Sequence, residues 1–302
     1  MNLIFATRPS ALARWQTAHV INLLQAAWPG LECSERIITT SGDRILDRPL
    51  PEIGGKGVFT SELETALLSG EVHVAVHSLK DLPVEDTAGI VIAAIPARES
   101  AFDVLVSANG QTLADLPESA RVGTCSLRRT AQLLARRPDL TILPLRGNVD
   151  TRVRKVMEGE YDAIVLAYAG LLRLGLEAHI TETFPLDVML PAPGQGALAV
   201  QCQADDAETI KLLAAIHDPV TAAAVDAERA FLAGLGGGCS LPIAAYAQKN
   251  DGSIILTGAV ISADGKQAIR LSAVDKDPYE LGERLADLVL ERGAADLLKA
   301  SV

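Results

Sequence analysis

The chain has 302 residues, a net charge of −11 and a hydrophobic content of 49%. This length suits two or three domains, and the composition favours a folded chain with buried cores over a disordered one. The acidic balance argues against nucleic acid as a partner. No run approaches the roughly 20 apolar residues of a membrane span, and the N-terminus lacks the pattern of a secretion signal, so we expect a cytoplasmic protein.

The cysteines form no zinc pattern and no C-x-x-C pair, so we expect reduced thiols and no metal site. They are Cys33, Cys125, Cys202 and Cys239. Cys239 follows three glycines in the loop from Leu235 to Ile243. A thiolate on such an accessible loop is a candidate for carrying a covalent group. The alternative is a small apolar residue at a tight turn.

The N-terminal part of the chain alternates strands with helices. The hydrophobic pattern predicts strands at residues 3–6, 35–40, 72–76 and 89–95, and helices at residues 12–27 and 58–68. Arg8 and Ser10 follow the first of these strands, and the run from His77 to Asp81 follows the third. Ligands bind at the carboxyl ends of strands in open α/β sheets, so these runs are candidate site segments. We expect His77 itself to be a core residue with satisfied hydrogen bonds.

A second unit repeats this pattern. Strands are predicted at residues 121–124, 141–145 and 162–167, and helices begin after Ser126 and Asn148, which are suitable N-caps. Two such units suggest two lobes around a cleft. After the hinge-like loop from Pro191 to Gly196, we expect a strand at residues 197–201 to return to the first lobe.

From about Val220 the pattern changes to a helix at residues 221–232, strands at 244–248, 254–261 and 267–273, and a final helix from about Pro278. Strand runs followed by a helix suggest a small α+β domain. We therefore predict an α/β protein of three domains. They are residues 1–98 with 196–218, residues 99–195, and residues 219–302.

Basic residues are concentrated in one window, residues 121–155, which carries a net charge of +7 and leaves −18 for the remainder of the chain. Most of them are arginines, which grip carboxylate or phosphate through two parallel hydrogen bonds, so we expect a small polyanionic ligand. We interpret three as solvated helix positions: Arg136, Arg137 and Arg154. Four others lie at element boundaries and are candidate ligand contacts: Arg128, Arg129, Arg146 and Arg152.

Seven short segments occur in order along nearly the whole chain. They are Ala6-Thr-Arg-Pro-Ser10, Gly54-Gly-Lys-Gly-Val-Phe59, His77-Ser-Leu-Lys-Asp-Leu-Pro83, Gly123-Thr-Cys-Ser-Leu-Arg-Arg129, Leu145-Arg-Gly-Asn-Val-Asp-Thr-Arg152, Pro193-Gly-Gln-Gly196 and Gly237-Gly-Cys239. Together they resemble the porphobilinogen deaminase family, also called hydroxymethylbilane synthases. Each motif alone is weak, but seven in register are highly specific.

The resemblance implies a transferase of tetrapyrrole biosynthesis with two lobes like periplasmic binding proteins and a small third domain. Such an enzyme joins four porphobilinogen molecules head to tail with loss of ammonia and then releases linear hydroxymethylbilane. In this family the growing chain is built on a covalent dipyrromethane cofactor, and the family is typically monomeric. The acetate and propionate groups of each pyrrole fit an arginine-rich site inside an acidic protein.

The resemblance also assigns site residues. It places the cofactor thioether on Cys239 and the catalytic carboxylate, which assists loss of ammonia and stabilises cationic pyrroles, on Asp81. It implies further cofactor contacts at Lys56, Ser78, Lys80, Asp81, Thr124, Ser126, Arg128, Arg129, Arg146 and Gly147. It implies substrate contacts at Arg8, Ser10, Phe59, Arg146, Arg152, Arg173 and Gln195.

The sequence departs from the common family pattern at Cys125, Glu52 and Ser61, which affects peripheral contacts only. The alternative to the enzyme is a two-lobed anion-binding protein without catalysis, which leaves Cys239 and the third domain without a role. A nucleotide-dependent enzyme is disfavoured because no complete phosphate-binding motif is present.

Overall fold

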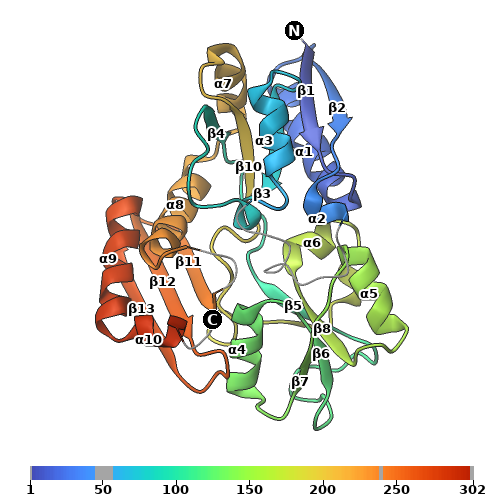
Figure 1. Cartoon of the computed structure of the whole chain (residues 1–302), viewed down its shortest axis with the longest axis vertical. Helices are drawn as coiled ribbons and strands as arrows, with labels where there is room; N and C mark the ends of the chain where they lie inside the picture. Colours follow the sequence, from blue (N-terminus) through green and yellow to red (C-terminus); the bar gives the residue numbers. More distant parts are fainter. Residues whose placement is uncertain (1, 45–56, 238–240, 300–302) are drawn as a thin grey trace. The chain divides into compact units, whose positions relative to one another are not determined.

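The computed structural model describes residues 2–44, 57–237 and 241–299 (Figure 1). The chain divides into two compact units, and each is described by itself. The first joins Met1–Arg98 to Ala197–Ala222, and the second joins Glu99–Gly196 to Ala223–Val302. Across the described ranges, none of the helices is both long and apolar enough to cross a membrane.

The first unit is built on a five-stranded sheet in the order β2-β1-β3-β10-β4. Its first three strands are parallel, and β10 runs antiparallel to both of its neighbours. In Figure 1 the gold β10 lies among the blue and cyan strands, because the chain returns to this sheet after residue 196. The strands are β1 (Asn2–Thr7), β2 (Glu32–Ile37), β3 (Val74–Ser78), β4 (Ile90–Ala94) and β10 (Leu198–Gln203).

Helices cover both faces of this sheet. Successive side chains of β1 point to opposite faces, so Leu3 and Phe5 pack with Val20, whereas Ala6 packs with Leu63. The helices are α1 (Ala11–Ala27), α2 (Ser41–Arg44), α3 (Ser61–Leu68) and α7 (Ala207–Leu213), with short 3-10 turns η2 (Leu79–Asp81) and η4 (Ala214–Ile216). His77 lies in this core as expected, but its Nε2 has no hydrogen-bond partner among the described residues.

The sheet of the second unit has the order β7-β6-β8-β5-β9 and the same pattern of directions. Here β5 runs antiparallel to β8, which is parallel to β6. The sequence reading did not include β5, whose first residue, Asp103, pairs with Ala167 at the end of β8. Asp103 therefore lies at the carboxyl ends of the parallel strands. The strands are β5 (Asp103–Ser107), β6 (Arg121–Gly123), β7 (Thr141–Leu143), β8 (Ala163–Ala167) and β9 (Glu182–Thr183).

The helices of this sheet are α4 (Leu127–Arg136), α5 (Val149–Met157) and α6 (Tyr168–Arg173), with the 3-10 turn η3 (Glu177–His179). Ser126 caps α4 as predicted, since its Oγ accepts a hydrogen bond from the Arg129 N–H. Asn148 occupies the N-cap position of α5, but its side chain makes no capping bond.

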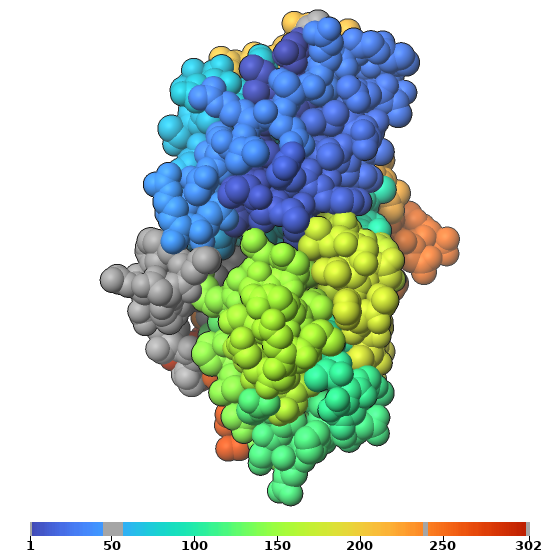
Figure 2. Space-filling view, turned by 90° about the vertical axis from the view of Figure 1, so that its right-hand side faces the viewer, coloured from blue at the N-terminus to red at the C-terminus, as the bar shows by residue number. Residues whose placement is uncertain are grey.

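Of the three arginines that we interpreted as solvated helix positions, two are exposed and one is not. The light-green segment of α5 lies at the surface in Figure 2, and its Arg154 forms an exposed ion pair with Glu158. Arg136 is also exposed. Arg137 is different, because its half-buried guanidinium pairs with Asp139 and donates to four backbone carbonyls of residues 113–117. The interpretation of Arg137 as a solvated position was therefore wrong, since its guanidinium donates to the backbone carbonyls of a neighbouring loop.

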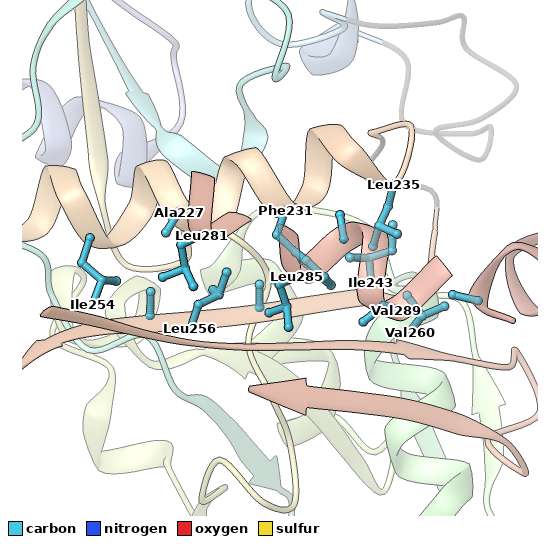
Figure 3. Packing of buried hydrophobic residues seen from close by; sticks show 14 of the residues in the cluster. Ala227, Phe231, Leu235, Ile243, Ile254, Leu256, Val260, Leu281, Leu285 and Val289 are labelled. Carbon is cyan, nitrogen blue, oxygen red and sulfur yellow. The ribbon is translucent and has the colours of Figure 1, made fainter. Parts of the chain in front are cut away.

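The C-terminal part of the second unit contains helix α8 from Ala223 onward and a three-stranded antiparallel sheet, β11-β12-β13. Phe231 of α8, Leu256 of β12 and Leu285 of α9 pack together in its core (Figure 3). The elements are α8 (Pro219–Gly234), β11 (Ile243–Asn250), β12 (Ser253–Ile261), β13 (Ala268–Asp275), α9 (Pro278–Glu291) and α10 (Ala294–Lys299).

The other face of this antiparallel sheet packs against α4. Ala244 and Ala259 share a buried cluster with Ala131 of α4. Gly265, at the turn between β12 and β13, has φ +73°, and a Cβ there would lie 2.4 Å from the Ala131 carbonyl oxygen. The helix that carries Arg128 and Arg129 is therefore fixed on one side by its own lobe and on the other by the C-terminal sheet.

Candidate active site

Predicted site residues of the first unit gather where its strands end. Ser10 begins α1 after β1, and its Oγ accepts a hydrogen bond from the Ala13 N–H at 3.3 Å. Ser78 ends β3, and its Oγ accepts a hydrogen bond from Gln16 Nε2 at 2.8 Å. The 3-10 turn η2 then carries Lys80 and Asp81. The sequence prediction that polar groups meet at this sheet edge agrees with the parallel pairing of β1 and β3.

The Asp81 side chain differs from its neighbours. It is exposed, and within the described part of the chain it has neither a hydrogen bond nor an ion pair. Lys80, one residue earlier, is half-buried and does have an interaction. A carboxylate held on a turn after a buried strand, with both oxygens uncommitted, is able to accept a proton or to stabilise a developing cation.

Arg8 and Phe59 lie together with a carboxylate that the sequence reading did not select, Asp43. The Asp43 carboxylate accepts hydrogen bonds from Nε and Nη2 of Arg8 and from the backbone N–H and hydroxyl of Thr40. Although burial raises it, these bonds hold the pKa of Asp43 below its usual value. The Arg8 guanidinium also lies 4.2 Å from the centre of the Phe59 ring. The ring edge in turn contacts the backbone of Gly42, where no Cβ fits.

In the second unit, side chains from two segments, helix α4 and the loop from Pro191 to Gly196, converge on the carboxylate of Asp103, which is fully buried. Arg128 donates to its Oδ2 at 2.6 Å, and Arg129 donates to its Oδ1 from Nε at 3.0 Å and from Nη2 at 2.7 Å. Gln195, also fully buried, donates from Nε2 to Oδ1 at 3.1 Å and to the Ala101 carbonyl at 2.7 Å. Burial lowers the pKa of the Arg128 guanidinium.

The remaining predicted residues of this unit lie on nearby loops. Thr124 is buried, and its hydroxyl accepts a hydrogen bond from the Ser126 N–H at 3.1 Å. Arg152 donates from Nε to the carbonyl of Gly147 at 2.7 Å, and Gly147 has φ +113°, which favours glycine. Arg146, beside Gly147, is half-buried.

Arg173 ends α6 and is 92% buried, and burial lowers the pKa of its guanidinium to about 10. Its Nη2 donates to the carbonyl of Gly196 at 2.7 Å. A Cβ at Gly196 would lie 2.3 Å from the Glu99 carbonyl oxygen, so only glycine fits there. The loop that ends the second lobe is therefore tightly packed around Arg173 and Gln195.

Two predicted residues, Cys239 and Lys56, lie outside the described residues. The other three cysteines are free: Cys33 is partly buried, Cys125 is exposed and Cys202 is buried. Burial raises the pKa of Cys202 to about 11, so it is a structural thiol. In the described ranges no group of three or more histidine, cysteine, aspartate or glutamate side chains could hold a metal ion.

The sequence reading missed Asp43 and Asp103, the two carboxylates that pair with predicted ligand-binding arginines. A sequence signal existed for Asp103, because it begins the apolar run Val104-Leu-Val106 and an acidic residue at a buried strand end requires a basic partner. Asp43 lies in the short helix α2, within a polar stretch of sequence where an aspartate is ordinary, and nothing in the sequence distinguished it.

Known proteins match this chain along nearly its whole length. Residues 3–211 match a domain described as "Porphobilinogen deaminase, dipyromethane cofactor binding domain", and residues 222–291 match "Porphobilinogen deaminase, C-terminal domain". The porphobilinogen deaminase of Roseiflexus castenholzii is 51% identical over 298 residues, which cover 98% of each chain. That of Brevibacillus brevis is 50% identical over 293 residues, which cover 97% of this chain and 95% of the relative.

The solved structures that match this chain are far more distant in sequence. A nutrient binding protein from Burkholderia cenocepacia bound to methionine has a TM-score of 0.43 and 15% identity, over 72% of this chain and 92% of that chain. The second periplasmic VFT domain of BvgS from Bordetella pertussis has a TM-score of 0.41 and 18% identity, over 71% and 86%.

The fold class predicted from the sequence is confirmed, with two mixed α/β sheets and a C-terminal antiparallel sheet with helices. The matched domains cover both the α/β part and the C-terminal part, and two relatives share about half of all residues. The chain belongs to the porphobilinogen deaminase family.

Proposed function

We propose that this chain condenses four porphobilinogen molecules head to tail, with release of ammonia, and then releases linear hydroxymethylbilane by hydrolysis. This reaction belongs to tetrapyrrole biosynthesis. The observation that carries the proposal is the exposed, uncommitted carboxylate of Asp81 at the carboxyl edge of the first sheet. A protein that only bound polyanions would gain nothing from a free negative charge at that position.

In this proposal Asp81 acts on the porphobilinogen that is losing ammonia. Its carboxylate stabilises the positive charge that develops on the pyrrole as ammonia leaves. It also accepts and returns the proton that moves between the pyrrole N–H and the leaving amine. Ser78 and Lys80 flank it on the same strand end. The hydrogen bond from Gln16 to Ser78 fixes the start of this turn, which limits the movement of Asp81.

Cys239 is the proposed attachment point of a dipyrromethane cofactor. When bound, the dipyrromethane supplies the pyrrole carbon to which substrate is added and through which the growing chain stays attached. The described residues fit a ligand that bears carboxylates, because Arg128 and Arg8 each keep guanidinium nitrogens without a partner among them. Further proposed contacts are Lys56, Thr124, Ser126, Arg146, Gly147, Arg152 and Arg173.

The proposed role of the arginines is electrostatic as well as geometric. Each added pyrrole brings two more carboxylates, and the +7 window from residue 121 to residue 155 offsets this accumulating charge inside an acidic chain. Attachment through Cys239 keeps intermediates from diffusing away, so each addition has one partner already in place.

The test of the catalytic role replaces Asp81 by asparagine, which keeps the size and removes the charge. The cofactor-loaded variant should bind porphobilinogen but release ammonia about a hundred-fold or more slowly. Asp86→Asn, at an exposed aspartate five residues further on, is the matched control and should retain wild-type turnover. Near-normal turnover of Asp81→Asn would remove Asp81 from this role.

The competing proposal is an anion-binding protein without catalysis. Cys239→Ser separates the two, since a binder keeps its affinity for porphobilinogen whereas the enzyme loses both cofactor and turnover.

We further propose a cytoplasmic monomer with the three domains predicted from the sequence. The family resemblance supports this organisation, and size-exclusion chromatography with light scattering tests the monomer.

A further inference from the structure

The cluster around Asp103 holds more positive than negative charge. Two guanidiniums, of Arg128 and Arg129, share this carboxylate, and all three side chains are at least nine-tenths buried. A buried pair of opposite charges is balanced, but the second arginine leaves one positive charge in excess. An anion close to one of the two guanidiniums would offset this excess charge.

The hydrogen bonds show which guanidinium is already satisfied. In Arg129 every nitrogen has a partner, because Nε and Nη2 donate to Asp103 and Nη1 donates to the Val165 carbonyl at 2.9 Å. In Arg128 only Nη1 is engaged, with Asp103 at 2.6 Å and the Leu190 carbonyl at 2.8 Å. Nε and Nη2 of Arg128 have no partner among the described residues.

The two acceptors that hold Arg128 are themselves fixed. Gln132 grips the Leu190 backbone from both sides, accepting from its N–H at 2.7 Å and donating to its carbonyl at 3.1 Å. Gln195 and Arg129 fix the other oxygen of Asp103. Nη1 of Arg128 is thus held between two immobile acceptors, which sets the orientation of the whole planar guanidinium.

Arg128 keeps 5% of its surface exposed, and among the described residues neither unengaged nitrogen is a fully buried polar atom that lacks a partner. Nε and Nη2 together form the edge of a guanidinium that binds a carboxylate through two parallel hydrogen bonds. In Arg129 the corresponding Nε–Nη2 edge is already engaged, because both nitrogens donate to Asp103.

We propose that Asp103 is a positioning residue which presents the Nε–Nη2 edge of Arg128 to a carboxylate of the pyrrole chain, while Arg129 and Gln195 hold Asp103 and do not grip the ligand. This division of roles rests on the proposed function. It differs from the sequence-based assignment, in which Arg128, Arg129 and Gln195 were all ligand contacts. The carboxylate belongs either to the cofactor or to a bound substrate unit.

The experiment compares Arg128→Lys with Arg129→Lys, because lysine keeps the charge and removes the bidentate edge. Each purified variant is incubated with porphobilinogen, and three quantities are measured. They are the fraction of chains that carry two extra pyrroles by intact mass, the KM of the cofactor-loaded enzyme, and the thermal midpoint. Asp162→Asn is the control, since Asp162 pairs with Arg121 in the same geometry but at the surface of this sheet.

Arg128→Lys should impair either cofactor loading or substrate binding, measured as KM, by about ten- to hundred-fold. Its thermal midpoint should change little. A fall in the loaded fraction identifies the cofactor as the source of the carboxylate, and a rise in KM at full loading identifies the substrate. Arg129→Lys should show the reverse pattern, a lower thermal midpoint and a smaller ligand effect than Arg128→Lys. The proposal is overturned if Arg129→Lys equals or exceeds Arg128→Lys in the ligand readouts, or if Arg128→Lys changes neither.

A double-mutant cycle tests Asp103 itself. Asp103→Asn should impair the same quantity, cofactor loading or KM, that Arg128→Lys impairs. In the Arg128→Lys background it should change that quantity by less than about two-fold further, because Asp103 acts through Arg128. Equal effects in both backgrounds would overturn the positioning role. If Asp103→Asn does not yield folded protein, Asp103→Glu replaces it. The turnover of the wild-type enzyme in the same assay tests the proposed function by itself. A failure of the proposed function can therefore be distinguished from a failure of the positioning role of Asp103.

Discussion

Phe231 is the aromatic centre of the C-terminal core, and its removal should loosen the helix that leads to the glycine–cysteine loop. Its side chain is fully buried on α8, close to Leu235 (Figure 3). Two glycines make room for it, because a Cβ at Gly258 of β12 would lie 2.5 Å from the ring and one at Gly282 of α9 would lie 2.7 Å from the Phe231 nitrogen.

The expected cost of Phe231→Ala follows from this burial. A buried aromatic side chain removes roughly 200 Å² from water, which corresponds to about 5 kcal/mol at 25 cal/mol per Å². Alanine keeps part of that area, and flanking elements cannot collapse fully into the space, so about 4 kcal/mol is expected. Phe231→Leu should cost about 1 kcal/mol, and Tyr279→Ala, at a side chain that is 58% exposed, less than about 0.5 kcal/mol.

Native-state hydrogen exchange read by mass spectrometry is the appropriate assay, because it reports each segment separately. Both tryptophans, Trp15 and Trp28, lie in the first unit, so their fluorescence does not follow this core. Phe231→Ala should accelerate exchange in β12 and α9 by about a thousand-fold, which is 4 kcal/mol expressed as an opening equilibrium. A decrease of less than about 1 kcal/mol in the free energy of opening would refute the view that the Phe231 ring organises this core.

Three further predictions concern stability and reactivity. Gly282→Ala should destabilise the chain by about 1–3 kcal/mol in urea, because its Cβ would lie 2.5 Å from that of Ala230; unchanged stability would mean that α8 and α9 separate easily. Burial lowers the pKa of His77 to about 4, so the unfolded chain binds its proton first. The stability contributed by neutral His77 is then complete above about pH 6.5 and falls by about 1.4 kcal/mol per unit as the pH drops toward 4; His77→Gln should flatten this part of the urea-unfolding profile, and an equally steep profile would contradict the assignment. Iodoacetamide should label exposed Cys125 in the native protein and Cys202 only after unfolding, as read by peptide mass; equal labelling rates would contradict the burial of Cys202.

Much of the fold could be predicted because hydrophobic periodicity and capping signals agree locally. The helix expected at 221–232 is α8 at Pro219–Gly234, and the three C-terminal strands lie within a few residues of their predicted bounds. The strand expected to return to the first lobe is β10, which pairs with β3 and β4. The polar motifs that follow β1 and β3 could be placed at one edge of the sheet, because the carboxyl ends of parallel strands lie at the same edge.

What the sequence could not give was the partner of each arginine. Arg128 and Arg129 are adjacent and look equivalent in the sequence, yet one has all its nitrogens engaged and the other does not. The difference depends on Asp103, which is 25 residues from Arg128 in sequence and lies on an unexpected strand. Such long-range pairing is set by sheet topology, which local patterns do not encode.

The intact mass of the purified, denatured chain tests the central claim most directly. The account predicts that the wild-type chain is heavier than its polypeptide by two linked pyrrole units, either as purified or after incubation with porphobilinogen, and that Cys239→Ser is not. A bare polypeptide mass after incubation, in a folded protein that still binds porphobilinogen, would contradict the account and favour an anion-binding protein without catalysis.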